Sequence, residues 1–168
     1  RDATFNGYDG SSPDTATPSI SEGAIGYCRT FNGTSDFITM NNTAESKINF
    51  PQNGYYSVRA WVYLDTIDIK SRCILSKGYE QYYLRSSSFS VDVIIPSPLW
   101  EFVEFNGEDK VWEVTNSPVT EKRQWVHLVG VRNGTQQYLY CNGVLVDSTT
   151  DKWPSGIADR KSSNDLNI

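Results

Sequence analysis

Residues 124–147 constrain the fold of this 168-residue chain more than any other stretch. Apolar and polar residues alternate along it, as in a strand with one buried face. The pairs Asn133-Gly134 and Asn142-Gly143 interrupt the alternation twice. Asn and Gly tolerate the positive φ angles of tight type I′ turns, so Asn-Gly between alternating runs predicts a β-hairpin. The stretch is therefore predicted to form three strands of an antiparallel meander.

Short strand-like runs recur along most of the remaining chain. The predicted strands are residues 25–31, 37–40, 56–65, 73–76, 81–85, 89–95, 99–105 and 111–115. Residues 1–22 are predicted to be loop with at most one short edge strand, and residues 42–48 to form one helical turn. Because no long window shows a helical period, and because many short strands follow at regular spacing, the sequence predicts an all-β sandwich or barrel.

Residues 56–65 show how the two faces of such a strand differ. Val58 and Val62 share one face with other small apolar residues, whereas Arg59, Trp61 and Tyr63 fall on the opposite face. Successive side chains of a strand point to opposite sides, so only one of these two sets can face the core.

Composition and charge exclude several classes of function. The length is that of one domain, and a chain of this size buries enough surface to fold without disulfides. The formal net charge is -5, and basic residues never cluster beyond adjacent pairs. Binding of nucleic acid through phosphate neutralisation is therefore not expected. No apolar run reaches the roughly 18 residues that would indicate a membrane span.

The three cysteines, Cys28, Cys73 and Cys141, are too far apart for a local zinc motif. All three lie in apolar, strand-like runs, so they are expected to be buried, reduced side chains. If a disulfide forms, the Cys28–Cys141 bridge is the expected one.

Five segments in order resemble laminin G-like modules of the concanavalin A-like jelly-roll family. They are residues 26–38, 56–62, 74–78, 83–85 and 125–143, the last containing Trp125, His127 and the second Asn-Gly pair. The resemblance runs from about residue 5 to residue 168. It implies an all-β jelly-roll β-sandwich of two antiparallel sheets, with residues 1–168 forming a single domain.

The chain departs from the family pattern at both ends. The family usually has a Trp-containing first strand and continues with a final strand pair beyond a segment like residues 165–168. We therefore expect the chain to be a fragment of a longer protein, with terminal strands that are disordered, removed or supplied by another chain.

Aromatic side chains are the leading candidates for a ligand site. Sugars present apolar C–H faces that stack on Trp and Tyr, while polar groups fix the hydroxyls. The predicted ligand-binding residues are Tyr82, Tyr83, Arg85, Trp100 and Trp112, with Tyr79 and Trp153 as further candidates. Core packing is the alternative for each of them. Because Trp61 and Trp125 lie in the family's strand signatures, the resemblance places them in the core.

Catalysis has little support in the sequence. Glycoside hydrolysis needs two carboxyl groups flanking one bond. Glu101 and Glu104 lie on the only dense acidic strand, but at a spacing of three they face opposite sides of it. The single histidine, His127, has no identifiable catalytic partner and is expected to be structural. The chain is therefore predicted not to be an enzyme.

The resemblance also implies a structural calcium ion near the edge of the sandwich. Calcium is bound by several oxygen ligands from carboxylates and loop carbonyls. The matching oxygen-rich positions are Asp2, Asp9, Ser35 and Asp36. The alternative for these residues is ordinary turn chemistry, in which Asp and Ser bond to the local backbone.

The sequence therefore predicts a non-catalytic binding module of a secreted or cell-surface protein, with a carbohydrate as its partner. The first alternative is a protein-interaction or adhesion module with an extracellular protein as partner. The second is a glycan-cleaving enzyme, and a purely structural role also stays open.

Overall fold

The computed structural model describes residues 6–43, 47–51, 54–68, 70–78, 81–87, 98–106, 111–150 and 166–168, excluding the side chains of residues 105–106 and 111–114. The strands are β1 (Ser19–Glu22), β2 (Tyr27–Thr30), β3 (Thr39–Met40), β4 (Tyr55–Tyr63), β5 (Arg72–Lys77), β6 (Tyr82–Ser87), β7 (Leu99–Asn106), β8 (Val111–Pro118), β9 (Trp125–Asn133), β10 (Gln136–Cys141), β11 (Val144–Thr150) and β12 (Leu166–Asn167). One short 3₁₀ helix, η1 (Asp14–Ala16), is the only helix in these ranges.

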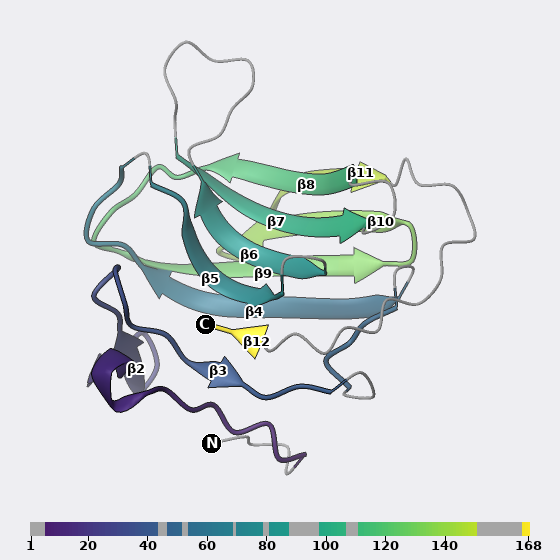
Figure 1. Ribbon diagram of the computed structural model, residues 1–168. Helices are drawn as coiled ribbons and strands as arrows, with labels where there is room; N and C mark the ends of the chain where they lie inside the picture. The colour runs from purple at the N-terminus through teal and green to yellow at the C-terminus, as the bar shows by residue number, and fades with distance from the viewer. Residues whose placement is uncertain are drawn as a thin grey trace.

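Two antiparallel sheets stack face to face, and this arrangement confirms the predicted all-β sandwich (Figure 1). One sheet has the strand order β11-β10-β9-β4, and the other has the order β3-β12-β5-β6-β7-β8. The strands β1 and β2 form a separate hairpin. In Figure 1 the N-terminal segment with η1 and β2 lies to one side of the two sheets.

The predicted meander forms, but its two turns differ. Asn142 and Gly143 have φ angles of 51° and 81°, as a two-residue type I′ turn requires. At the first turn Asn133 is still part of β9 and pairs with Gln136. Only Gly134, at φ 61°, has a positive angle there, which is the pattern of a type II′ turn. The prediction of type I′ geometry is therefore confirmed at the second turn and wrong at the first.

Most predicted strands agree with the structure to within two or three residues at each end. The first two, β2 and β3, are shorter than predicted. The predicted strand 89–95 lies outside the described residues, and the predicted helical turn at 42–48 lies partly outside them. The two residues of β12 pair with β3 on one side and with β5 on the other.

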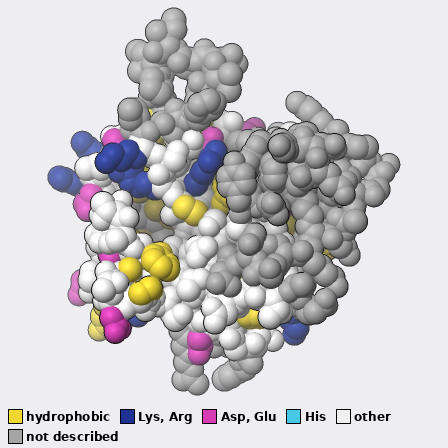
Figure 2. All heavy atoms as spheres, in the orientation of Figure 1, with side chains coloured by type: hydrophobic (Ala, Val, Ile, Leu, Met, Phe, Trp, Pro, Cys, Tyr) yellow, Lys and Arg dark blue, Asp and Glu magenta, His cyan; other side chains and the backbone are white. Residues whose placement is uncertain are grey.

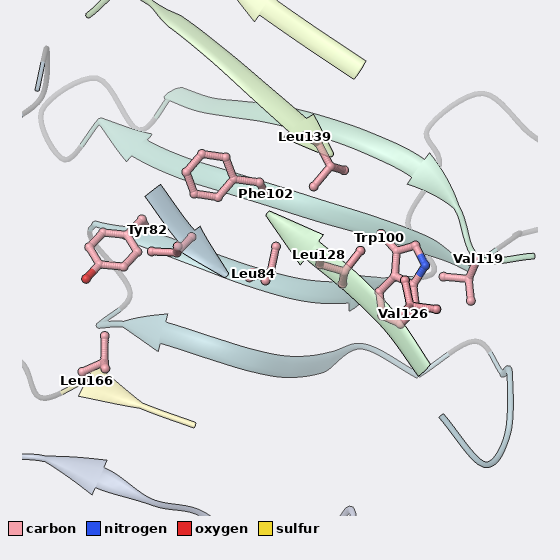
Figure 3. Packing of buried hydrophobic residues seen from close by; sticks show 10 residues of the cluster. Tyr82, Leu84, Trp100, Phe102, Val119, Val126, Leu128, Leu139 and Leu166 are labelled. Carbon is pink, nitrogen blue, oxygen red and sulfur yellow. The ribbon is translucent and has the colours of Figure 1, made fainter. Parts of the chain in front are cut away.

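The core lies between the two sheets. Figure 3 shows Tyr82, Leu84, Trp100 and Phe102 of the six-stranded sheet packed against residues of the four-stranded sheet. The latter are Val126, Leu128 and Leu139 together with Val58. Each of these side chains alternates with neighbours on the outer face of its sheet, so the core fixes which residues of these strands point outward.

The two sheets are in close contact at Gly130 of β9. A Cβ atom at this position would lie 2.4 Å from Cγ of Phe102. No side chain fits at that distance, so the glycine makes room for the buried aromatic ring. The requirement is steric, because Gly130 does not have a positive φ angle.

A buried polar group also connects the two sheets. Arg132 of β9 forms an ion pair with Glu104 of β7, with 2.8 Å between Nη1 and Oε2. The Tyr56 hydroxyl of β4 donates a hydrogen bond to the same carboxylate. Gln137 of β10 donates from Nε2 to the carbonyl of Phe102 over 3.1 Å. A charge buried in this way is tolerated because it is paired and hydrogen-bonded.

The cysteines differ from the prediction of buried thiols. All three are free, so no Cys28–Cys141 bridge forms. Cys73 is exposed, and the other two are half-buried. Cys73 lies on the outer side of β5, opposite Arg85, because a register shift in this strand changes which residues face inward.

Substitution Gly130→Ala should destabilise the protein. The added methyl group would clash with Phe102, and overpacking of a core typically costs about 1–3 kcal/mol. Urea unfolding of the variant measures this loss, and Val129→Ala on the outward side of the same strand is the control. The double variant Gly130→Ala/Phe102→Leu should recover part of the loss, because the two sites are in contact. A Gly130→Ala variant as stable as the wild type would contradict the packing.

The Tyr56 hydroxyl should make stability depend on alkaline pH. Burial raises its pKa well above the usual range, and the Glu104 carboxylate adds to the shift. An unfolded tyrosine loses its proton near pH ~10. The pKa of Tyr56 is higher in the folded state than in the unfolded state. Its contribution to the free energy of unfolding is therefore complete below pH ~10 and is lost as the pH rises beyond it.

We therefore expect Tyr56→Phe to flatten the decline of unfolding free energy above pH ~10, by up to about 1.4 kcal/mol per pH unit. Urea titrations across this pH range measure the slope. Tyr55→Phe makes the same chemical change on the exposed side of β4 and is the matched control. Equal changes of slope in both variants would show that the effect does not come from burial.

Candidate functional site

The outer face of the four-stranded sheet is rich in aromatic side chains. The core takes Val58, Val126, Leu128 and Leu139 from β4, β9 and β10, which leaves the alternate residues of these strands outside. We call this surface the aromatic face, and its aromatic members are Tyr55, Trp61, Tyr63, Trp125, His127, Tyr138 and Tyr140.

One cluster of rings lies where β4 ends and β9 begins. Trp61 pairs across the strands with His127, and Tyr63 with Trp125. The Trp61 and His127 rings stack with 4.8 Å between centroids and 26° between planes. Tyr63 and Trp125 lie 5.5 Å apart at 55°. Trp61 keeps 46% of its surface exposed and Tyr63 keeps 42%, so both rings can contact a ligand.

The type I′ turn fixes the position of His127. The backbone N–H of His127 donates to Oδ1 of Asn142 over 2.9 Å. In return, the backbone N–H of Asn142 donates to the His127 carbonyl over 2.8 Å. The same asparagine that allows the tight turn therefore holds the strand segment whose imidazole stacks on Trp61.

A second aromatic group surrounds a hollow farther along the same face. The hollow has a volume of about 660 Å³ and is lined by Tyr55, Tyr138, Tyr140, Val129, Val131 and their neighbours. The Tyr138 and Tyr140 rings lie 6.5 Å apart. The Tyr138 hydroxyl donates to Oε1 of Gln136 over 2.5 Å. The hollow therefore combines ring faces with hydroxyl and amide groups.

Two polar side chains of β4, Arg59 and Ser57, lie between Trp61 and Tyr55 along the strand. Arg59 is exposed and lies beside Val129 of β9, which in turn lies beside Tyr140 of β10. Ser57 is also exposed, and its neighbour on β9 is Val131. Among the outward residues of β4, β9 and β10, only Arg59 carries a permanent charge. The aromatic face therefore offers stacking surfaces, hydrogen-bonding groups and a single cation.

Most of the ligand-binding residues predicted from the sequence lie elsewhere. Tyr82 is 3% exposed and Trp100 is 2% exposed, and both pack in the core (Figure 3). The prediction that these two rings are exposed is wrong, because they lie on the faces of β6 and β7 that point into the core. A ring enclosed by the core has no free face on which a sugar could stack.

Tyr83 and Arg85 lie on the outer face of the six-stranded sheet. Tyr83 is also buried, and the guanidinium of Arg85 lies 5.1 Å from the centre of its ring. Arg85 forms an ion pair with Glu101, with 2.5 Å between Nε and Oε2. Tyr83 therefore offers little ring surface to a ligand, and the Arg85 guanidinium is already engaged.

Figure 2 looks onto the side of the six-stranded sheet. Lys and Arg side chains gather toward its upper left, and the described hydrophobic side chains form only small patches. The side chains of Trp112, Tyr79 and Trp153 lie outside the described residues, so their predicted roles stay predictions.

The prediction that Trp61 and Trp125 belong to the core is wrong. Both occupy outward positions, Trp61 on β4 and Trp125 on β9. The signal for this was present in the sequence, because Trp61 shares its face of the strand with Arg59. A face that carries an arginine is the more suitable one for solvent.

The two glutamates of β7 face opposite sides, as the sequence predicted. Glu101 pairs with Arg85 on the outer face, and Glu104 pairs with Arg132 inside the sandwich. Both carboxylates are buried, but only Arg132 is buried with its partner, whereas Arg85 keeps 30% of its side chain exposed. This arrangement does not place two carboxyl groups on either side of one glycosidic bond.

The calcium positions show turn chemistry where they are described. Both carboxylate oxygens of Asp36 accept hydrogen bonds from Asn32, and Ser35 accepts one from the Asn32 amide. Asp9 is exposed, and Asp2 lies outside the described residues. Within the described ranges, no three His, Cys, Asp or Glu side chains cluster as a metal site. Calcium binding at Asp2, Asp9, Ser35 and Asp36 therefore stays a prediction.

The described part of the chain contains no helix long and apolar enough to cross a membrane.

Comparison with known proteins places the fold in a family. The model of the concanavalin A-like lectin/glucanases superfamily matches residues 32–168. The chain is also similar in structure to domain 4 of AbnA, a GH43 extracellular arabinanase from Geobacillus stearothermophilus, solved in complex with arabinotriose. The TM-score is 0.68 at 17% identity, covering 99% of this chain and 75% of that chain. At this identity the likeness shows a shared fold. The comparison with curated proteins gave no match.

Proposed function

The chain belongs to the concanavalin A-like lectin/glucanases superfamily, and from this membership we propose that it is a non-catalytic carbohydrate-binding module. We place the binding site on the aromatic face of the four-stranded sheet. The observation that carries this proposal is the exposed, stacked pair of Trp61 and His127 beside Tyr63 and Trp125.

Binding would use the two kinds of group that the face provides. The apolar C–H face of a sugar ring stacks on an exposed Trp or Tyr ring. Hydroxyl groups of the sugar exchange hydrogen bonds with Arg59, Ser57 and the tyrosine hydroxyls. Holding Trp61 against His127 lowers the cost of ordering the indole when the ligand binds.

The solved structure with a related fold supports a carbohydrate as the ligand class. That structure is a domain of an extracellular arabinanase and contains arabinotriose. By analogy, this chain would act outside the cell or at its surface. The separation of Glu101 from Glu104 supports a role in binding rather than in cleavage.

A protein-interaction role is the second candidate, and a different part of the molecule favours it. The β1–β2 hairpin and its turn expose Ile20, Ile25 and Tyr27, the last at 84%. Exposed apolar side chains in one hairpin are typical of contact surfaces between proteins.

The proposal is tested by titrating the protein with neutral oligosaccharides, arabinotriose among them, in a calorimeter. Trp61→Ala should weaken the affinity for a bound saccharide at least about tenfold, a loss of about 1.4 kcal/mol. Tyr27→Ala also removes an exposed ring, but outside the aromatic face, and is the matched control. If Trp61→Ala and Tyr27→Ala bind as the wild type does, the site is not the aromatic face. If the wild type binds no saccharide at all, the protein-interaction role gains support.

A further inference from the structure

We infer that the aromatic face binds an internal segment of a linear, uncharged polysaccharide rather than a single sugar or a chain end. This inference rests on the proposed carbohydrate-binding function and specifies its ligand.

The first argument is the length of the face. The outward residues of β4 run from Tyr55 to Tyr63 and include Ser57, Arg59 and Trp61. A strand advances ~3.4 Å per residue, so this row spans about 27 Å. That length exceeds a single sugar ring severalfold and suits an oligosaccharide chain lying along the strands.

The second argument is the separation of the aromatic groups. Trp61 stacks with His127 at one end, and Tyr138 lines the hollow near the other. In the sheet register, Tyr138 lies opposite Val131, four positions along β9 from His127. At the rise of a strand these positions are about 14 Å apart. One sugar cannot contact both Trp61 and Tyr138, but one chain can.

The third argument is that no described residue closes either end of the row. Tyr55 keeps 80% of its surface exposed and Tyr63 keeps 42%. Described residues therefore do not wall off either end, and the hollow at the Tyr55 end opens onto the sheet surface. A site that recognises a chain end needs a wall against which the terminal sugar stops, whereas an open row lets a chain pass through.

The fourth argument concerns charge. Arg59 is the one permanent charge among the outward residues of β4, β9 and β10, and it lies between Trp61 and Tyr55 along β4. The other polar groups there include Ser57, Gln136 and the tyrosine hydroxyls, which pair with sugar hydroxyls without requiring a charge. A polyanionic chain would meet only a single cation, so the face suits an uncharged chain.

The test measures affinity as a function of ligand length. Linear arabino-, xylo- and gluco-oligosaccharides, each from the disaccharide to the octasaccharide, are titrated into the protein together with an acidic oligogalacturonide. Since contacts to one chain at two places reinforce each other, affinity in the binding series should rise at least about tenfold with length before it levels off. Blocking the reducing end of the octasaccharide should leave its affinity unchanged.

Two variants locate the ends of the bound segment. Trp61→Ala and Tyr138→Ala should each weaken binding of the octasaccharide, while at most one of them weakens binding of the disaccharide. Tyr27→Ala is the control, and circular dichroism confirms that each variant is folded.

The outcomes separate the inference from the function on which it rests. A disaccharide that binds as tightly as the octasaccharide, or a blocked end that abolishes binding, would overturn the inference while carbohydrate binding stands. Tighter binding of the oligogalacturonide than of every neutral series would overturn the uncharged class. If no saccharide binds, the proposed function fails and the inference fails with it.

Discussion

The close approach of the two sheets at Gly130 and Phe102 is the constraint on which the rest of the structure depends. The ring of Phe102 occupies the space that a side chain at Gly130 would need. Beside this contact, Arg132 reaches from the same strand to the buried Glu104 carboxylate. Removing either partner of such a pair would leave an unpaired buried charge, which is strongly destabilising. The steric contact and the ion pair together fix how β9 lies against β7.

The orientation of β9 decides what the protein can present to a ligand. With Gly130 and Arg132 facing inward, the alternate residues Trp125, His127 and Val129 must face outward. The register with β4 then brings Trp61 onto His127 and Tyr63 onto Trp125. The packing of the core therefore determines which side chains form the aromatic face. A shift of β9 by one residue would turn its outward aromatic side chains into the core.

Strand positions were predictable because alternation and turn residues are local signals. Asn142-Gly143 marked a turn whose φ angles the structure confirms. Which face of β7 points inward was not predictable, because glutamates occur on both faces. Glu101 is balanced by Arg85 and Glu104 by Arg132, and both partners are distant in sequence. The sequence therefore predicts Trp100 at the surface although it lies in the core, and the family resemblance predicts Trp61 in the core although Arg59 on its face indicates solvent.

The most direct test of the account is the response of the tryptophan indole N–H signals in a ¹⁵N-correlated NMR spectrum to the saccharide that binds most tightly. Trp61 and Trp125 lie on the aromatic face, whereas Trp100 is enclosed in the core. Assignment by single Trp→Phe variants identifies each signal. The account predicts that the signals of Trp61 and Trp125 shift with added saccharide and that the signal of Trp100 does not. Shifts confined to backbone amides of β6 and β7, with Trp61 unchanged, would place the binding site on the other sheet and contradict the account.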